Sequence, residues 1–286
     1  MSITVNTNMQ ALRIQTNLSK ATNKMNTAME RMSSGSKINS AKDDAAGLAV
    51  ATKLGTTISS SKVASNNVAI GSNLLDTAEG TLNVVTQNLQ RVRDLTEQAS
   101  NGTYSTSDLA AIGAEVDARL KEVDVLAAGT TFNGIKLFND ATAGTSGITL
   151  QVGAAASDSL VLSSSIFGTI GEVAALTGIT STTSGITSGN NALAASFLTA
   201  IDTQLNNITT RITLIGAGQN QLEAVSDGLT VQQTNLTAAK STIKDADVAQ
   251  ESASYVQQQI LQQASSSLLV QANSAPQIAL TLIKGQ

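Results

Sequence analysis

Two long hydrophobic repeats with alternating spacings of three and four residues constrain this fold more than any other feature. One repeat occupies the C-terminal half: Leu198, Ile201, Leu205, Ile208, Ile212, Ile215, Leu222, Leu229, Leu236 and Ile243. The other precedes the middle of the chain: Val68, Gly71, Leu75, Ala78, Leu82, Val85, Leu89, Val92, Thr96 and Ala99. A 3.5-residue period keeps one apolar line of a helix turned toward a partner helix. The two repeats therefore predict paired helices with an intrachain core that includes Leu75, Leu82, Leu89, Leu205, Ile212 and Leu222.

Weaker repeats lie near the two ends of the chain. The first is Ala11, Ile14, Leu18, Ala21, Met25, Ala28 and Met32. The second is Ala253, Val256, Ile260, Gln263, Ser267 and Val270, with Leu268 beside it. These repeats contain small or polar residues, and isolated helices of this kind are only marginally stable in water. We therefore expect about 40 residues at each end of the chain to become ordered only on assembly. The predicted assembly seams are Ile14, Leu18, Met25, Met32, Val256, Ile260 and Leu268.

The amino-acid composition argues against enzymatic catalysis, against metal binding and against binding of nucleic acid. The chain of 286 residues has no His and no Cys, which removes the commonest general base and the commonest metal ligands. We therefore expect no enzyme, no cofactor and no metal site. The net charge is −4 without a basic run, so phosphate binding is not expected. The N-terminus lacks the features of a signal peptide, and no segment is apolar enough to span a membrane.

Periodicity and turn signals predict a mainly α fold. We expect an elongated rod of long antiparallel coiled-coil helices, with a small β-hairpin element and both termini paired at one pole. The expected segments are 1–40 (N-terminal helix and turn), 41–130 (N-terminal rod helices), 131–176 (β-element), 177–190 (tip loop), 191–242 (C-terminal rod helix) and 243–286 (C-terminal helix).

Several boundaries are predicted more closely. The first helix runs from Asn8 to Met32 with Gly35 as its stop. Asp43 and Asp44 lie in the first turn of the second helix as dipole and cap partners rather than as a metal pair. A third helix begins near Ser107. Asn133-Gly134 is a turn, and alternation at 148–152 and 160–162 predicts strands. From 191 onward the chain is expected to stay helical to about residue 282.

Several motifs resemble a known family. The segment from Met32 to Val50 closely resembles the N-terminal signature of bacterial flagellins. Similar matches occur at Gln90–Leu95, Phe132–Lys136, Asp245–Glu251, Gln259–Ala264 and Gln271–Asn273. The resemblance covers about residues 1–140 and 195–286, in the family order. Only about 50 residues separate the two halves, which looks like a minimal flagellin without large outer domains.

The resemblance implies a structural subunit that polymerises into the extracellular flagellar filament for swimming motility. Family members are exported unfolded by the flagellar type III apparatus with a flagellin-specific export chaperone, and are added at the distal tip. The implied partners are copies of the chain itself, the chaperone, and the filament cap and hook-junction proteins. The expected location is secreted and extracellular, without membrane insertion. The alternatives are a hook–filament junction protein of the same family and a non-flagellar signalling coiled coil.

Two further expectations concern surfaces. By resemblance, Arg91, Leu95 and Glu115 match positions at which flagellins are recognised by the flagellin-sensing Toll-like receptor. The alternative interpretation is that they form a solvent-exposed helix face without a binding role, with one Leu beside the hydrophobic repeat. The Ser and Thr residues of 181–188 are candidate O-glycosylation sites, and an unmodified loop is an equally good interpretation.

Overall fold

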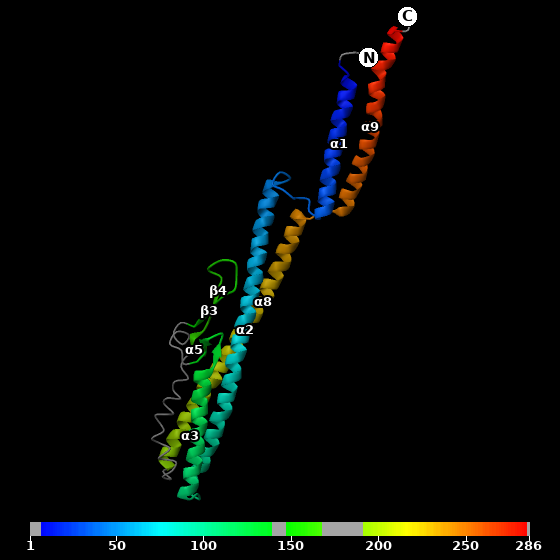
Figure 1. The fold of residues 1–286 in the computed structure, drawn as a ribbon. Helices are drawn as coiled ribbons and strands as arrows, with labels where there is room; N and C mark the ends of the chain where they lie inside the picture. Colours follow the sequence, from blue (N-terminus) through cyan, green and yellow to red (C-terminus); the bar gives the residue numbers. More distant parts are fainter. Residues whose placement is uncertain (1–6, 139–146, 168–190, 285–286) are drawn as a thin grey trace. The chain divides into compact units, whose positions relative to one another are not determined.

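Long helices make up most of the chain that the computed structural model describes, which comprises residues 7–138, 147–167 and 191–284. The helices are α1 (Met9–Ser34), α2 (Ala45–Ala99), α3 (Thr106–Gly129), α5 (Ser164–Phe167), α8 (Asn191–Lys244) and α9 (Val248–Lys284) (Figure 1). The strands are β1 (Thr131–Phe132), β2 (Ile135–Lys136), β3 (Ile148–Gln151) and β4 (Ser159–Leu162). The predicted mainly α class with a small β-hairpin element is confirmed.

The chain forms two compact units. Unit 1 comprises residues 1–58 and 234–286, and unit 2 comprises residues 59–233. In unit 1, α1 begins after Asn8, whose side-chain Oδ1 accepts a hydrogen bond from Ala11 N at 3.0 Å. It ends at Gly35, where φ is +66°, a left-handed conformation that suits glycine. The first helix and its stop are therefore as predicted.

A break between α8 and α9 contradicts the continuous helix expected from residue 191 onward. α8 ends at Lys244, and α9 begins after Asp247, whose Oδ1 accepts hydrogen bonds from Ala249 N (2.9 Å) and Gln250 N (3.2 Å). The same segment pairs with the end of α1. Lys37 N donates to Lys244 O at 2.8 Å, and Ala246 N donates to Gly35 O at 2.9 Å. These backbone bonds replace the intrahelical bonds that a continuous helix would have made.

The start of α2 also differs from the prediction. The helix begins at Ala45, so Asp43 and Asp44 precede its first turn. Asp44 still caps it, because its Oδ1 accepts a hydrogen bond from Gly47 N at 2.9 Å. Asp43 closes the preceding loop through bonds from the backbone and hydroxyl of Ser40 and the backbone of Asn39, and these bonds lower the pKa of its carboxyl group.

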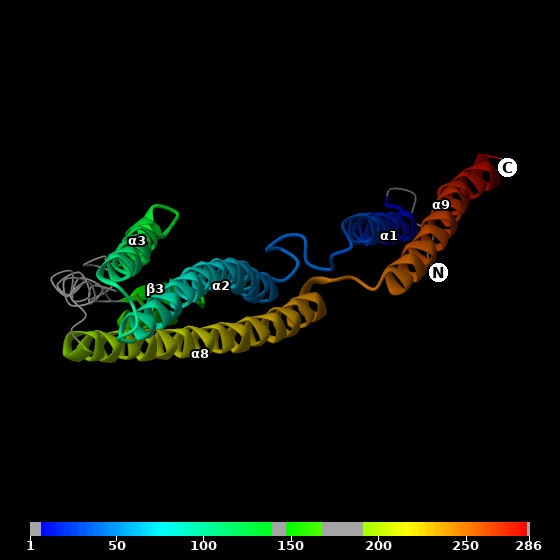
Figure 2. The ribbon, with the colours of Figure 1, turned by 90° about the horizontal axis from the view of Figure 1, so that it is seen from below.

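The core of unit 2 is the antiparallel packing of α2 against α8, which lie side by side in Figures 1 and 2. Arg93 contacts Asp202 near one end, with Nε and Oδ1 2.7 Å apart. Ser61 Oγ donates to Gln232 near the other end at 3.3 Å. All ten residues of the predicted repeat on α2 are buried.

On α8 the packing follows the predicted repeat in one of its two rows. Ile201, Ile208, Ile215, Leu222 and Leu229 are buried. Leu205 and Ile212, from the other predicted row, are only half-buried. The second row of buried residues instead contains Gln204, one residue before Leu205, and Gly218, fourteen residues further along the helix. A Cβ at Gly218 would lie 3.2 Å from Leu75 Cδ1, so the missing side chain allows the helices to approach closely. Of the predicted core residues, Leu75, Leu82, Leu89 and Leu222 are fully buried.

α3 packs on α2 and begins with a capping box. Ser105 Oγ accepts a hydrogen bond from Asp108 N, and Asp108 Oδ2 accepts one from Ser105 N. The hydrogen bonds from Ser105 lower the pKa of the Asp108 carboxyl group. Arg119 Nη1 donates to the buried Asn88 Oδ1 of α2 at 3.0 Å. The helix starts at Thr106, one residue before the predicted start.

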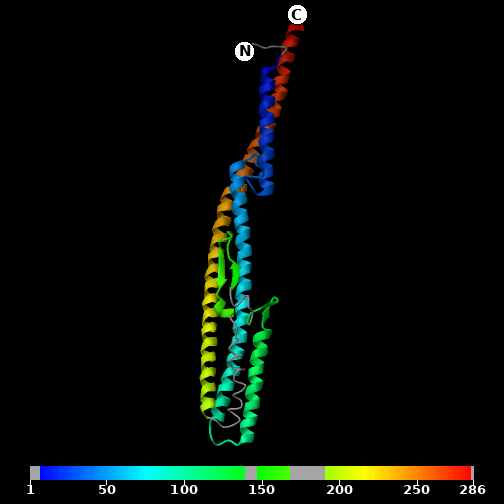
Figure 3. The ribbon, with the colours of Figure 1, turned by 90° about the vertical axis from the view of Figure 1, so that its left-hand side faces the viewer.

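Two antiparallel hairpins complete unit 2 (Figure 3). Asn133 and Gly134 turn β1 into β2 with φ of +49° and +80°, as their sequence predicts. β3 pairs with β4 from Ile148 opposite Leu162 to Gln151 opposite Ser159. A Cβ at Gly71 of α2 would lie too close to Leu150 Cδ1 unless that side chain shifted, so this glycine marks where the hairpin contacts the helix. The predicted tip loop at 177–190 and its candidate glycosylation sites lie outside the described residues.

Truncation of one seam residue tests this core. We expect Leu82→Ala to lower the free energy of unfolding of the monomer by about 2–5 kcal/mol, because it removes a fully buried side chain and leaves a cavity. Val84→Ala, two residues away on the exposed side of α2, is the control and should change stability by less than about 1 kcal/mol. Urea denaturation followed by circular dichroism measures both. Equal losses in the two variants would contradict the assignment of the core.

Candidate assembly surface

The terminal helices α1 and α9 form an antiparallel pair in unit 1 (Figure 3). The predicted repeat on α1 is the face that this pairing covers. Ala21 and Ala28 are buried, and the other members are half-buried. Four predicted assembly residues therefore lie within the helix pair: Ile14, Leu18, Met25 and Met32.

Polar contacts fix the register of the two helices. Asn8 Nδ2 donates to Ala272 O at 2.8 Å. Gln262 Nε2 donates to Thr22 Oγ1 at 3.2 Å. Arg31 Nη1 lies 3.2 Å from Glu251 Oε1 in a partly exposed ion pair. These three contacts join residues more than 200 positions apart and run in opposite directions along the two helices.

The face that α9 turns toward α1 is mostly small or polar. Its covered residues are Tyr255, Gln258, Gln262, Ser265, Leu269 and Ala272. The predicted α9 seam is therefore not the face that meets α1. Apolar residues occur on more than one side of this helix, and the side that meets α1 is the one with the hydrogen bonds of Gln262 and Ala272.

The apolar side chains on the uncovered side of α9 form what we term the outer face: Val256, Ile260, Leu261, Leu268 and Val270. The exposed fractions are 50% for Val256, 60% for Ile260 and 57% for Leu268. Burying an aliphatic side chain of this size contributes about 1.5–3 kcal/mol. A row of exposed aliphatic residues on one helix is typical of an interaction surface. The outer face contains all three predicted assembly residues of α9.

The residues predicted by resemblance to meet a receptor do not form one exposed patch. Arg91 Nε and Glu115 Oε1 form an exposed ion pair at 3.2 Å between α2 and α3. Leu95 is only 2% exposed and belongs to the core of unit 2. The two charged side chains therefore face solvent, whereas the leucine does not.

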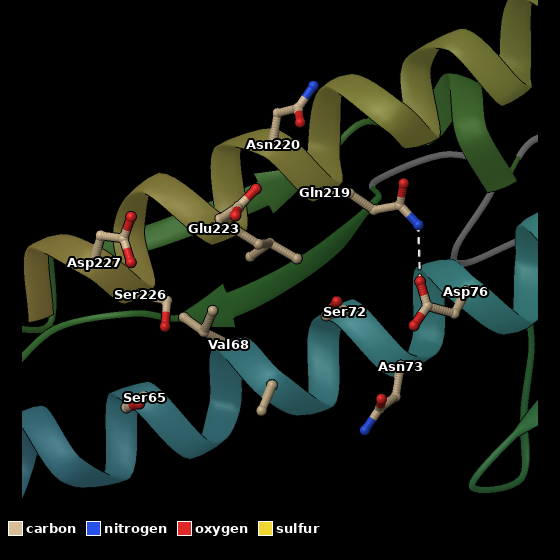
Figure 4. Close-up of a pocket in the computed structure, with 12 residues that line it drawn as sticks. Ser65, Val68, Ser72, Asn73, Asp76, Gln219, Asn220, Glu223, Ser226 and Asp227 are labelled. Carbon is tan, nitrogen blue, oxygen red and sulfur yellow. Dashed lines mark hydrogen bonds between the residues drawn. The ribbon is translucent and has the colours of Figure 1, made fainter. Parts of the chain in front are cut away.

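A polar groove of about 600 Å³ lies between α2 and α8 in unit 2. Figure 4 shows Asp76, Gln219, Glu223 and Asp227 around it, with Gln219 bonded to Asp76. Gln219 Nε2 donates to Asp76 Oδ1 at 2.8 Å and to Glu79 Oε2 at 3.0 Å. Within the described residues, no cluster of three or more His, Cys, Asp or Glu side chains could hold a metal ion. The same part of the chain contains no helix that is long and apolar enough to cross a membrane.

Sequence reasoning missed two features of unit 1, and one of them had a signal. Asp is a preferred N-cap residue, so Asp247 could have indicated that a new helix begins there. The covered face of α9 had no comparable signal, because Gln258, Gln262 and Ser265 do not look like a seam. Their position follows from partners on α1.

Comparison with known proteins connects this chain to a family. The family described as "Bacterial flagellin N-terminal helical region" matches residues 5–143, and "Bacterial flagellin C-terminal helical region" matches residues 198–283. A flagellin from Listeria monocytogenes is 37% identical over 98% of this chain and 99% of its own length. A flagellin from Bacillus subtilis is 34% identical over the same shares of the two chains.

A solved structure shares the fold. It is described as that of a flagellar hook-associated protein from Vibrio parahaemolyticus, with a TM-score of 0.60. The alignment covers 71% of this chain and 100% of that one, at 16% sequence identity. At this identity the similarity concerns the helical fold alone.

Proposed function

Because this chain belongs to the bacterial flagellin family and is a structural subunit of the extracellular flagellar filament, we propose that the outer face of α9 is a surface by which copies of it join. The observation that carries this proposal is the exposure of Val256, Ile260 and Leu268 on a helix whose opposite side is covered. On polymerisation, a neighbouring copy covers these exposed side chains. We infer that the polar groove in unit 2 is not a catalytic site and that the protein acts without an enzymatic step.

The predicted seam residues then divide into two roles. We propose that Ile14, Leu18, Met25 and Met32 hold α1 against α9 within one copy. Val256, Ile260 and Leu268 contact a neighbouring copy instead. Half-buried positions on α1 and exposed positions on α9 support this division. The alternative role in a hook–filament junction differs in copy number, and the two relatives described above, each covered over 99% of its length, are called flagellins.

Substitution of Ile260 tests the outer face. We expect Ile260→Ser to raise the critical concentration for seeded filament growth at least about tenfold, because losing about 1.5–3 kcal/mol of burial per contact weakens each addition. Sedimentation and electron microscopy of seeded reactions measure this change. Val125→Ser, which alters an exposed residue of α3 in unit 2, is the matched control and should grow filaments normally.

The thermal unfolding of unit 2 should be unchanged in Ile260→Ser, because residue 260 belongs to unit 1. A variant that grows filaments at the wild-type critical concentration would contradict the proposed role of the outer face. A lower melting temperature of unit 2 would instead indicate a folding defect.

We propose that the flagellin-specific export chaperone binds the outer face of α9 before assembly and that the chain is exported unfolded. The supporting observation is that the same apolar side chains need cover in a chain that has not yet polymerised. Filament cap and hook-junction proteins would meet this face at the filament ends, where no neighbouring copy covers it. Ile260→Ser should weaken these contacts too.

Hydrogen exchange tests the coupling of order to partners. We expect α1 and α9 amides in a verified monomer to exchange quickly and those of α2 from residue 68 onward to be protected, because the terminal pair buries few large side chains. Adding the export chaperone should protect α9, and polymerisation should protect both helices. Strong protection of α1 and α9 in the free monomer would contradict this proposal.

We propose that any recognition by the flagellin-sensing Toll-like receptor uses Arg91 and Glu115 directly and Leu95 as their support. The exposed ion pair and the buried leucine favour this arrangement. Arg91→Ala should reduce the potency of purified monomer in a receptor reporter assay at least about tenfold, because truncating a hot-spot residue costs about 2 kcal/mol or more and about 1.4 kcal/mol is already a factor of ten. Glu97→Ala, which removes the charge of another exposed side chain on α2, serves as the control. Full potency of Arg91→Ala, or no response to the wild-type monomer, would sink the idea.

A further inference from the structure

A line of apolar side chains on α2 in unit 2 faces solvent. Val63, Ile70 and Val84 are separated by multiples of seven residues, with Thr77 at the remaining position. Their exposed fractions lie between 41% and 57%. Residues seven apart lie on the same side of a helix, so these four positions form one continuous line. We term it the α2 ridge, and it is separate from the buried seam that meets α8.

The side of α8 that faces away from α2 has the same spacing. Ala217, Ala224 and Val231 are exposed and separated by seven residues each. Gly228 lies between the last two and is exposed as well. We term these four residues the α8 back. β-Branched side chains of the ridge fit against alanine and glycine, because small residues leave room for a neighbouring helix to approach.

Charge indicates what can cover the ridge. Unit 2 contains 15 acidic and 7 basic residues, a net charge of −8, whereas unit 1 contains 6 acidic and 10 basic residues, a net charge of +4. Two copies of unit 2 therefore repel each other at most approaches. The α2 ridge and the α8 back contain no charged residue. They are therefore surfaces at which two such units can come together without burying a charged side chain of either line.

We propose that the α2 ridge of one copy packs on the α8 back of a second copy in the filament. The proposal rests on the proposed function, in that it assigns the unit 2 contact of the same polymer. The two surfaces belong to different helices, so the contact is heterologous and leaves a free ridge and a free back on every pair. Such a contact propagates into a helical assembly when its rotation does not close a ring.

Disulfide trapping tests the contact, because the chain contains no cysteine of its own. Three double variants combine Ile70→Cys with Ala217→Cys, Ala224→Cys or Val231→Cys, which covers three axial registers. Filaments are grown under reducing conditions, oxidised, dissociated and separated without reductant. A disulfide requires Cα atoms about 4.4–6.8 Å apart, so a ladder of covalent oligomers from any of the three supports the proposal.

Control variants distinguish a missing ridge contact from a failure of filament assembly. Each single-cysteine variant should give monomer alone, and Val125→Cys with Ala224→Cys should give no ladder. Filaments that grow normally but give no ladder in all three double variants would overturn the ridge contact and leave the filament role intact. Dimers from a single variant would overturn its heterologous character. If a cysteine at 70 prevents growth, Val63→Cys replaces it with the same outcomes.

Discussion

The packing of α2 against α8 is the constraint on which unit 2 depends. Its buried residues follow the seven-residue repeat with few interruptions, and Gly218 brings the helices close enough for Leu75 to contact α8. The other parts of the unit use this pair as a surface: α3 contacts it through Asn88, and the β3–β4 hairpin contacts it at Gly71. A chain with only 2% aromatic residues obtains its core from many aliphatic contacts along a seam rather than from a few large ones.

In unit 1, the pairing of α1 with α9 buries only part of the aliphatic side chains. Its helix pair buries alanines on α1 and covers glutamine and serine on α9, while the aliphatic side chains of α9 remain exposed. Hydrogen bonds from Asn8 and Gln262 set the register but contribute only about 0.5–1.5 kcal/mol each. In the proposed assembly, contacts of the outer face with a neighbouring copy add the aliphatic burial that this helix pair lacks on its own. The proposed assembly surface is thus a consequence of how the pair is built.

The sequence predicts the fold well where local pattern and packing agree. The α2 repeat, the Gly35 stop and the Asn133-Gly134 turn each depend on neighbouring residues in the sequence. The failures occur where distant residues decide. The end of α8 depends on backbone bonds to Gly35 and Lys37, and the orientation of α9 depends on Thr22. Resemblance to a family marks Leu95 as a candidate receptor contact, but its burial follows from the packing of this chain.

The same separation extends to charge. Unit 2 is acidic and has a complete internal core, so neighbouring copies meet there as folded bodies that repel except along uncharged lines. Unit 1 is basic overall, but α9 has Glu251 and Lys284 as its only charged residues, so its association is governed by apolar area. Ionic strength then acts mainly on the repulsion between unit 2 of one copy and unit 2 of another. Salt screening shortens the range of this repulsion and does not change the burial of aliphatic side chains. Repulsion between copies before assembly thus arises in unit 2, whereas the proposed apolar contacts of both units hold the copies together after it.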